Sequence, residues 1–430
     1  MIEKDSAEAL VIAYIRAWHE AWASVQERFK SQVDFKVWRG VVGALDAAHF
    51  ALGADSCSGG SYGKPAEHDP ERETIVGFVS DGADAARVET QSSGIVTQYW
   101  EYELVLAAGE PKFKKIRRHF EPKGTPVIEP EVAALLLEQP TKDAALEALP
   151  RGFDPNGDAL FETGRELTHG DHTYRLEVRA LGELQTKTGV LSALDFGSDA
   201  HGLSPFARRL APGSYPVEVC VAESRVAAMR VRISEAPVTT WHPATFTDGS
   251  HVFGVDAANV VVFDVAAFAQ LDAWEKERVF EANIEGGRPL ARMMTLRSPG
   301  DAVIVGTGFG DGAYPCYWGV DAEGNIARLF LDFLMLGTFL EESCTIEWTG
   351  GSITHPLLAD WGVELAVEGK YLIARGDAFN RAVVTQGADK FDSSRVGVRV
   401  NGAERRHDFK KELAAPLTIE VTVGTGFRNG

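Results

Sequence analysis

Apolar residues near the start of the chain recur at intervals of three and four. This is the period of an α-helix with one buried face. The expected apolar face consists of Leu10, Tyr14, Trp18, Trp22, Val25 and Phe29. Residues 35–52 show the same period, with Trp38, Val42 and Leu45 among the apolar positions. The pattern predicts two amphipathic helices in succession.

Beyond residue 70 the helical period gives way to short apolar segments that turn residues separate. Asp81-Gly82, Ser92-Ser93-Gly94 and Ala108-Gly109-Glu110-Pro111 supply the turns. Short β-prone segments divided in this way predict an antiparallel meander. The expected strands are residues 75–79, 86–90, 95–106 and 113–120.

Two helices followed by a curved antiparallel sheet, with Tyr99 to Leu104 beside the strand that contains Ile116, resemble the cone-shaped fold of nuclear transport factor two. The closest resemblance is to the versions found as immunity proteins of polymorphic toxins. That fold implies a cavity between helices and sheet, and such cavities hold ligands. The candidate lining residues are Tyr14, Trp18, Trp38, His49, Tyr99 and Tyr102. The alternative is that these aromatic residues form a plain hydrophobic core.

Prolines mark a change after the first region. Pro122, Pro126, Pro130, Pro140 and Pro150 interrupt the chain and predict a linker at residues 122–160. Short helices are expected within it at residues 131–138 and 142–149. After residue 340 short β segments return, at residues 344–348, 363–367, 371–374, 395–400 and 417–423.

Glycine alternates with acidic and aromatic residues between Val305 and Phe333, a composition that excludes a helix. A glycine-rich turn after an apolar strand is typical of a phosphate-binding loop. However, Asp311 stands where a dinucleotide-binding motif has its third glycine, and no lysine followed by serine or threonine closes the loop. We therefore expect a β-hairpin that turns at residues 321–325, and no nucleotide or other cofactor.

Five short motifs in a fixed order carry a second resemblance. They are Gly213 to Val217, Arg225 to Ala228, Phe253 to Ala257, Gly310 to Pro315 and Trp318 to Gly324. Residues 164–340 resemble a bacterial domain of unknown function, the family numbered 4241. The resemblance implies a β-rich domain, often encoded near toxin and immunity systems, with no established activity or catalytic residues. Its motif residues here include Gly310, Asp311, Gly312, Tyr314, Trp318, Asp321 and Gly324.

Aspartates of these motifs are the best candidates for chemistry. If Asp256, Asp311 and Asp332 met at one end of a sheet, their oxygens could bind a divalent cation or act as an acid–base pair. The alternative is structural. Aspartate in a turn bonds to backbone amides two residues on, and an aspartate that interrupts an apolar strand needs a buried partner. No metal site is predicted from residue spacing.

The chain of 430 residues has a formal net charge of −19. Such acidity disfavours nucleic acid unless a basic patch is segregated. The one candidate patch, Lys112 to His119, alternates with Phe113, Ile116 and Phe120 and fits a solvated strand face better, so we expect no nucleic acid partner. It suits a basic protein, such as a toxin. The 4 cysteines have no metal or redox spacing, and no signal peptide or membrane span is expected, which favours the cytoplasm. The oligomeric state stays open.

The sequence thus predicts a multidomain, β-rich α+β protein. N-terminal helices on a curved antiparallel sheet (residues 1–121) and a linker (122–160) precede a mainly antiparallel β domain with few helices (161–341). A β-rich C-terminal domain or extension (342–430) follows. The leading function is non-enzymatic, immunity-like protein binding. The alternatives are a hydrolase or metal-dependent enzyme that uses the aspartates of the third region, and small-ligand binding in the N-terminal cone.

Overall fold

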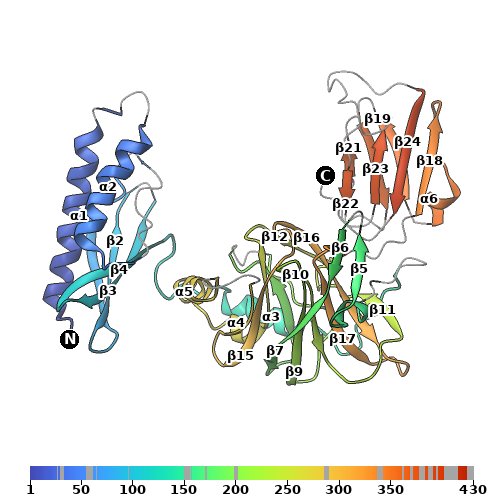
Figure 1. The fold of residues 1–430 in the computed structure, drawn as a ribbon, viewed down its shortest axis with the longest axis horizontal. Coiled ribbons are helices and arrows are strands. Elements are labelled where there is room, and N and C mark those ends of the chain that lie inside the picture. The colour runs from blue at the N-terminus through green and yellow to red at the C-terminus, as the bar shows by residue number, and fades with distance from the viewer. Residues whose placement is uncertain are drawn as a thin grey trace. The chain divides into compact units, whose positions relative to one another are not determined.

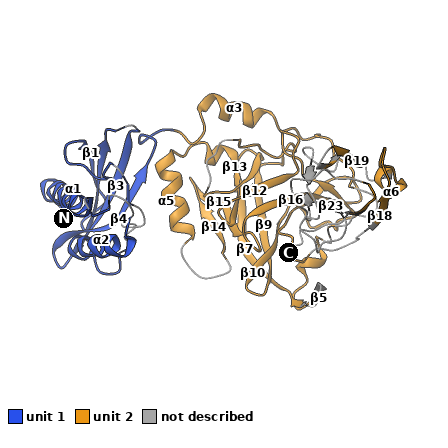
Figure 2. Cartoon of the chain, turned by 90° about the horizontal axis from the view of Figure 1, so that it is seen from above, with its two compact units in different colours: residues 1–125 blue, residues 126–430 orange. Residues whose placement is uncertain are grey.

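The computed structural model describes most of the chain. Described are residues 1–26, 28–29, 33–54, 62–63, 65–94, 96–149, 155, 157–169, 172–197, 202–284, 290–336, 342–360, 363–368, 371–376, 383–385, 391–393, 396–400 and 415–423. The chain forms two compact units, Met1–Thr125 and Pro126–Gly430, which Figure 2 colours separately. We describe each unit by itself.

The first unit packs two helices on an antiparallel sheet (Figure 1). Its elements are α1 (Lys4–Gln26), α2 (Phe35–His49), β1 (Glu73–Ser80), β2 (Ala85–Ser92), β3 (Gln98–Ala107) and β4 (Glu110–His119). The strands pair in the order β1-β2-β3-β4. Asp34 caps α2 by accepting hydrogen bonds from the amides of Lys36 and Val37, which otherwise lack partners. The predicted helices and meander are confirmed.

Two sheets face each other in the second unit. The larger has the order β11-β16-β17-β10-β9-β7, with β12 also paired to β16, and the smaller has the order β14-β15-β13-β8. The larger sheet comprises β7 (Glu177–Thr186), β9 (Gly213–Ala222), β10 (Arg225–Arg232), β11 (Thr240–Pro243), β12 (Val252–Val255), β16 (Gly312–Val320) and β17 (Ile326–Asp332). The smaller comprises β8 (Leu191–Leu194), β13 (Asn259–Asp264), β14 (Ala291–Thr295) and β15 (Pro299–Gly306).

The central strands of these sheets, such as β13 and β17, are buried on both faces, because side chains alternate across a strand and both sets are apolar. On β17, Leu329 and Leu331 enter the core between the sheets, while Phe330 packs in a cluster on the other face. That outer cluster includes the 3-10 helix η1 (Ala159–Phe161). The helices α3 (Pro130–Glu138) and α4 (Val265–Phe268) contribute to a third cluster with β13 and β15. The helix α5 (Ala273–Ile284) packs against it through Phe280, and a hairpin of β5 (Glu166–His169) and β6 (His172–Arg175) completes the region.

The predicted linker is largely a packed part of the second unit. The boundary between units lies at Thr125, and α3 beyond it buries Ala133 and Leu136. The helix expected at residues 142–149 is wrong, since this segment is irregular. Its carbonyls bind tertiary partners instead of helical amides: Arg208 donates to the oxygen of Ala144 and His242 bonds to that of Glu147.

The C-terminal part forms two further sheets around a core of its own. One has the order β18 (Glu342–Trp348), β24 (Leu417–Val423), β23 (Val396–Val400) and β22 (Phe391–Ser393). The other joins β19 (Val363–Glu368), β20 (Tyr371–Gly376) and β21 (Val383–Thr385), beside the short helix α6 (Pro356–Asp360). The five strands expected here are confirmed. Among the described residues, no helix is long and apolar enough to span a bilayer.

Candidate functional site

Several motif residues of the second unit meet at one end of its larger sheet. There the turn before Arg225, the turn at Asp256 and the loop at residues 307–311 lie side by side. The amide of Gly308 donates to the Val226 carbonyl (3.1 Å) and that of Thr307 to the Ala258 carbonyl (3.2 Å). We call this surface the loop end, made of residues 223–225, 256–258, 307–311 and 332–336.

The glycine-rich loop at residues 307–311 is locked by its own hydrogen bonds. The amide of Gly310 donates to the Thr307 carbonyl (2.7 Å), and the Tyr314 hydroxyl donates to the carbonyls of Gly310 (2.6 Å) and Thr307 (3.1 Å). Gly308 and Gly310 adopt φ angles of 49° and 119°, the region that favours glycine. Because the amides of Gly308 and Gly310 already have acceptors, they are not available to cradle a phosphate. The interpretation as a tight hairpin entry fits this geometry.

The three candidate aspartates reach the loop end in different states. Asp256 and Asp311 are exposed, whereas Asp332 is buried. Asp332 accepts a hydrogen bond from the Leu334 amide (2.8 Å), and its burial raises the pKa of the carboxyl to about 7. Within the described residues, no group of three or more His, Cys, Asp and Glu side chains is placed to hold a metal ion. The hypothesis that these aspartates bind a cation or act as an acid–base pair stays a prediction, and the burial of Asp332 apart from the exposed Asp256 and Asp311 does not favour it.

Two further aspartates of the second unit hold backbone turns. Asp195 accepts hydrogen bonds from the amides of Asp256 (2.5 Å), Ala257 (2.7 Å) and Gly197 (3.0 Å). Asp321 accepts from the Asn325 amide (2.8 Å) in the predicted turn at residues 321–325, where Gly324 has φ 86°. A carboxylate engaged by backbone amides in this way stabilises a loop. Trp318, another motif residue, is a core side chain at 1% exposure.

Sequence reasoning missed the most exposed aromatic side chain of the loop end. Phe309 is 52% exposed, and the Arg225 guanidinium lies 5.4 Å from its ring centre. Arg225 also donates to the Gly308 carbonyl (2.9 Å), which fixes it against the loop. Together with Asp256 and Asp311, the exposed Glu223 places three carboxylates on this surface. The sequence did hold a signal for this surface residue, because Phe309 is a large apolar residue between two turn glycines, Gly308 and Gly310.

One known protein family matches the part of the chain that contains the motifs. Residues 184–331 match the family model DUF4241. That family is described as a protein of unknown function, and the match runs from the end of β7 into β17. No curated protein and no solved structure matches the chain. The resemblance of the N-terminal unit to the nuclear transport factor two cone has no support from these comparisons and stays a prediction.

The aromatic residues proposed for a cavity in the first unit are mostly its core. Tyr14, Trp18, Trp38 and Tyr102 are at most 1% exposed, and the rings of Trp18 and Trp38 lie edge to face at 5.3 Å. His49 and Tyr99 are half-buried. His49 bonds to the Leu45 carbonyl one helical turn earlier (2.9 Å).

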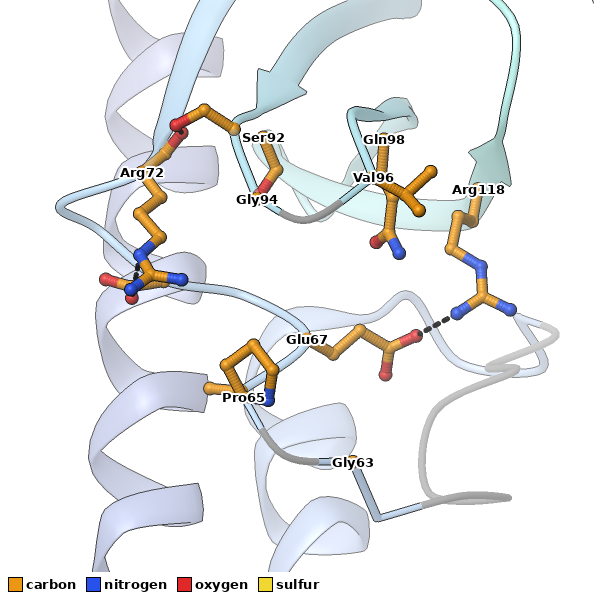
Figure 3. Close-up of a pocket in the computed structure, with 12 residues that line it drawn as sticks. Gly63, Pro65, Glu67, Arg72, Ser92, Gly94, Val96, Gln98 and Arg118 are labelled. Atoms are coloured by element: carbon orange, nitrogen blue, oxygen red, sulfur yellow. Dashed lines mark hydrogen bonds and ion pairs between the residues drawn. The ribbon is translucent and has the colours of Figure 1, made fainter.

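A cavity of about 290 Å³ with charged groups in its wall opens elsewhere in this unit, and none of the six proposed residues lines it (Figure 3). It lies between the segment that precedes β1, the turn from β2 to β3, and β4. Its lining residues are Gly63, Pro65, Ala66, Glu67, Asp69, Arg72, Ser92, Ser93, Gly94, Val96, Gln98 and Arg118. Two ion pairs stand in its wall: Arg118 with Glu67 (3.3 Å) and Arg72 with Asp69 (3.5 Å).

A buried polar network holds the segment that carries these acids. His68, between Glu67 and Asp69, is 3% exposed and lies 2.8 Å from the Glu73 carboxylate through Nδ1. The same carboxylate accepts hydrogen bonds from the hydroxyls of Tyr102 (2.6 Å) and Thr90 (2.5 Å). Desolvation by burial raises the pKa of the Tyr102 hydroxyl, and the neighbouring Glu73 carboxylate adds a smaller effect in the same direction. Such a satisfied buried network keeps the backbone next to the cavity in one conformation.

Proposed function

We propose that the chain is a non-enzymatic binding protein that recognises a basic protein partner through the loop end. The observation that carries the proposal is the exposed ring of Phe309 on the loop end, the surface that also carries the exposed carboxylates of Glu223, Asp256 and Asp311. An aromatic side chain that becomes desolvated at the centre of an interface supplies binding energy, while charges around it steer the encounter.

The chemistry of the acidic residues favours binding over hydrolysis. A metal-dependent hydrolase needs carboxylates that converge on one point. Here Asp195 and Asp321 bind backbone amides, and Asp332 is buried away from the exposed Asp256 and Asp311. The formal net charge of −19 adds long-range attraction for a basic protein. A toxin partner, as the immunity-like resemblance implies, is consistent with this charge.

A binding comparison tests the proposal. The tagged full chain captures partners from the native host, and the affinity of each captured basic protein is then measured for three variants. Phe309→Ala should weaken a genuine partner about 30-fold or more, the effect of losing about 2 kcal/mol at an interface anchor. Asp256→Asn with Asp311→Asn should slow association and flatten its dependence on salt, because screening acts on exposed charges.

Phe35→Ala is the matched control, since Phe35 is an exposed phenylalanine (44%) in the first unit. It should leave the affinity unchanged. A basic partner that binds Phe309→Ala as tightly as the wild type would rule out the loop end as its binding surface.

A further inference from the structure

Both signs of charge line the cavity of the first unit. Arg72 and Arg118 provide two cationic groups, and Glu67 and Asp69 provide two anionic ones. From this arrangement we propose that the cavity binds a small zwitterion of the α-amino acid class. The site lies in a different unit from the loop end, so the proposal is independent of the basic-partner function.

Charge balance selects the class of ligand. The four charged side chains of the wall sum to zero, so a purely anionic ligand would face Glu67 and Asp69 without compensation, and a purely cationic one would face the arginines. A molecule that carries a carboxylate and an ammonium can satisfy both kinds of group. Figure 3 shows Arg72 on one side of the cavity and the Glu67–Arg118 pair on the other, with Gln98 and Ser92 above them.

Arg118 is the group best placed to bind the carboxylate. Its guanidinium lies 5.0 Å from the ring centre of Phe120 and 5.9 Å from that of Trp100, which restricts its rotamers. One nitrogen, Nη1, donates to Glu67 (3.3 Å). A guanidinium has five N–H donors, so donors remain for a bidentate contact with a carboxylate.

Glu67 is the better of the two acids for the ammonium. Its side chain is 27% exposed, whereas that of Asp69 is 17% exposed and also accepts a hydrogen bond from the Glu71 amide (3.0 Å). On the opposite wall the Ser93 amide donates to the Arg72 carbonyl (3.0 Å), which ties the turn from β2 to β3 to the segment before β1.

The site is small, and one segment of its wall is anchored. The buried His68–Glu73 pair holds the segment between Glu67 and Asp69, so little order has to be gained on binding. A cavity of about 290 Å³ is at the lower limit of ligand sites. At roughly 30 Å³ for each water-sized group, it holds on the order of ten non-hydrogen atoms. This is the size of a free amino acid.

Calorimetric titration of the full chain with each of the twenty standard L-amino acids tests the proposal. At least one should bind. Its analogues that lack either the amino group or the carboxyl group should bind at least tenfold more weakly, because each loses one charge-assisted contact. Arg118→Gln and Glu67→Gln should each weaken binding at least tenfold, while Arg39→Gln, at an exposed arginine of α2 outside the cavity, should not.

Circular dichroism of each variant confirms that it is folded before titration. Loss of binding in Arg118→Gln and Glu67→Gln, with Arg39→Gln unaffected, supports the site. The proposal fails if no amino acid binds, if the single-charge analogues bind as well as the parent, or if Arg118→Gln binds with unchanged affinity.

Discussion

Gly310 offers a direct test of the argument that the glycine-rich loop is built for backbone geometry. Its φ of 119° is a conformation that side chains rarely adopt, yet an added Cβ would meet only the Ala258 Cβ at 3.7 Å. Gly310→Ala therefore introduces strain without a steric clash. The strain costs about 1–3 kcal/mol. The reduced freedom of the unfolded chain returns about 0.4–1 kcal/mol. The middle values of these two ranges are about 2 and 0.7 kcal/mol, so we expect a net destabilisation of about 1–2 kcal/mol.

Hydrogen exchange of the full chain measures this locally, in peptides from residues 302–320. A loss of about 1–2 kcal/mol should accelerate exchange about 5- to 30-fold where opening limits it. Gly254→Ala is the matched control, because Gly254 lies on the neighbouring strand β12 with open space around an added Cβ and no unusual φ. Asp311→Asn, at an exposed side chain, should change stability by less than about 0.5 kcal/mol. If Gly310→Ala exchanges as slowly as the wild type, the backbone interpretation of this loop is refuted.

Two further predictions address a titration and the boundary between units. The folded-state pKa of Asp332, about 7, exceeds its ordinary value of 3.8, so its stabilising contribution is present at low pH and is lost as pH rises from about 4 to 7. Asp332→Asn should match the wild type in thermal stability near pH 4 and exceed it at pH 8; equal melting temperatures at pH 8 would contradict the assigned burial. Of the two lysines in the predicted linker, limited trypsin digestion should cut first after Lys123, because a hydrogen bond from the Thr141 amide to Ala207 (3.0 Å) anchors the backbone before Lys142. Intact mass identifies the fragments. An initial cut after Lys142 would contradict the boundary between units at Thr125.

The sequence predicted secondary structure well where local pattern and tertiary packing agree. The aromatic face of α1 is buried as its period requires, and the hairpin expected around residues 321–325 forms between β16 and β17. The segment at residues 142–149 shows the limit. Its residues favour a helix, but the segment is irregular because Arg208 and His242, more than sixty residues away in sequence, bind its carbonyls. No local pattern contains those contacts.

The candidate sites were harder to predict, because residue type does not give side-chain direction. Asp256, Asp311 and Asp332 do reach one end of the sheet, as the strand order requires, but the first two are exposed and the third is buried. The cavity of the first unit was missed for another reason. Its wall combines residues 63–72, the turn from β2 to β3, and Arg118, segments that only the folded sheet brings together.

The roles of aspartate and glycine in the second unit explain why its motifs identify a fold without indicating an activity. Asp195 fixes the turn at Asp256 and Ala257, Asp321 fixes the β16–β17 turn, and Gly310 permits the loop between β15 and β16. Each of these residues determines backbone geometry that would be needed whatever the surface bound. Side chains at the tips of such loops are free to differ without loss of the fold. Under the proposed function, recognition depends on Phe309 and the exposed side chains of the loop end, whereas Asp195, Asp321 and Gly310 hold the loops in place.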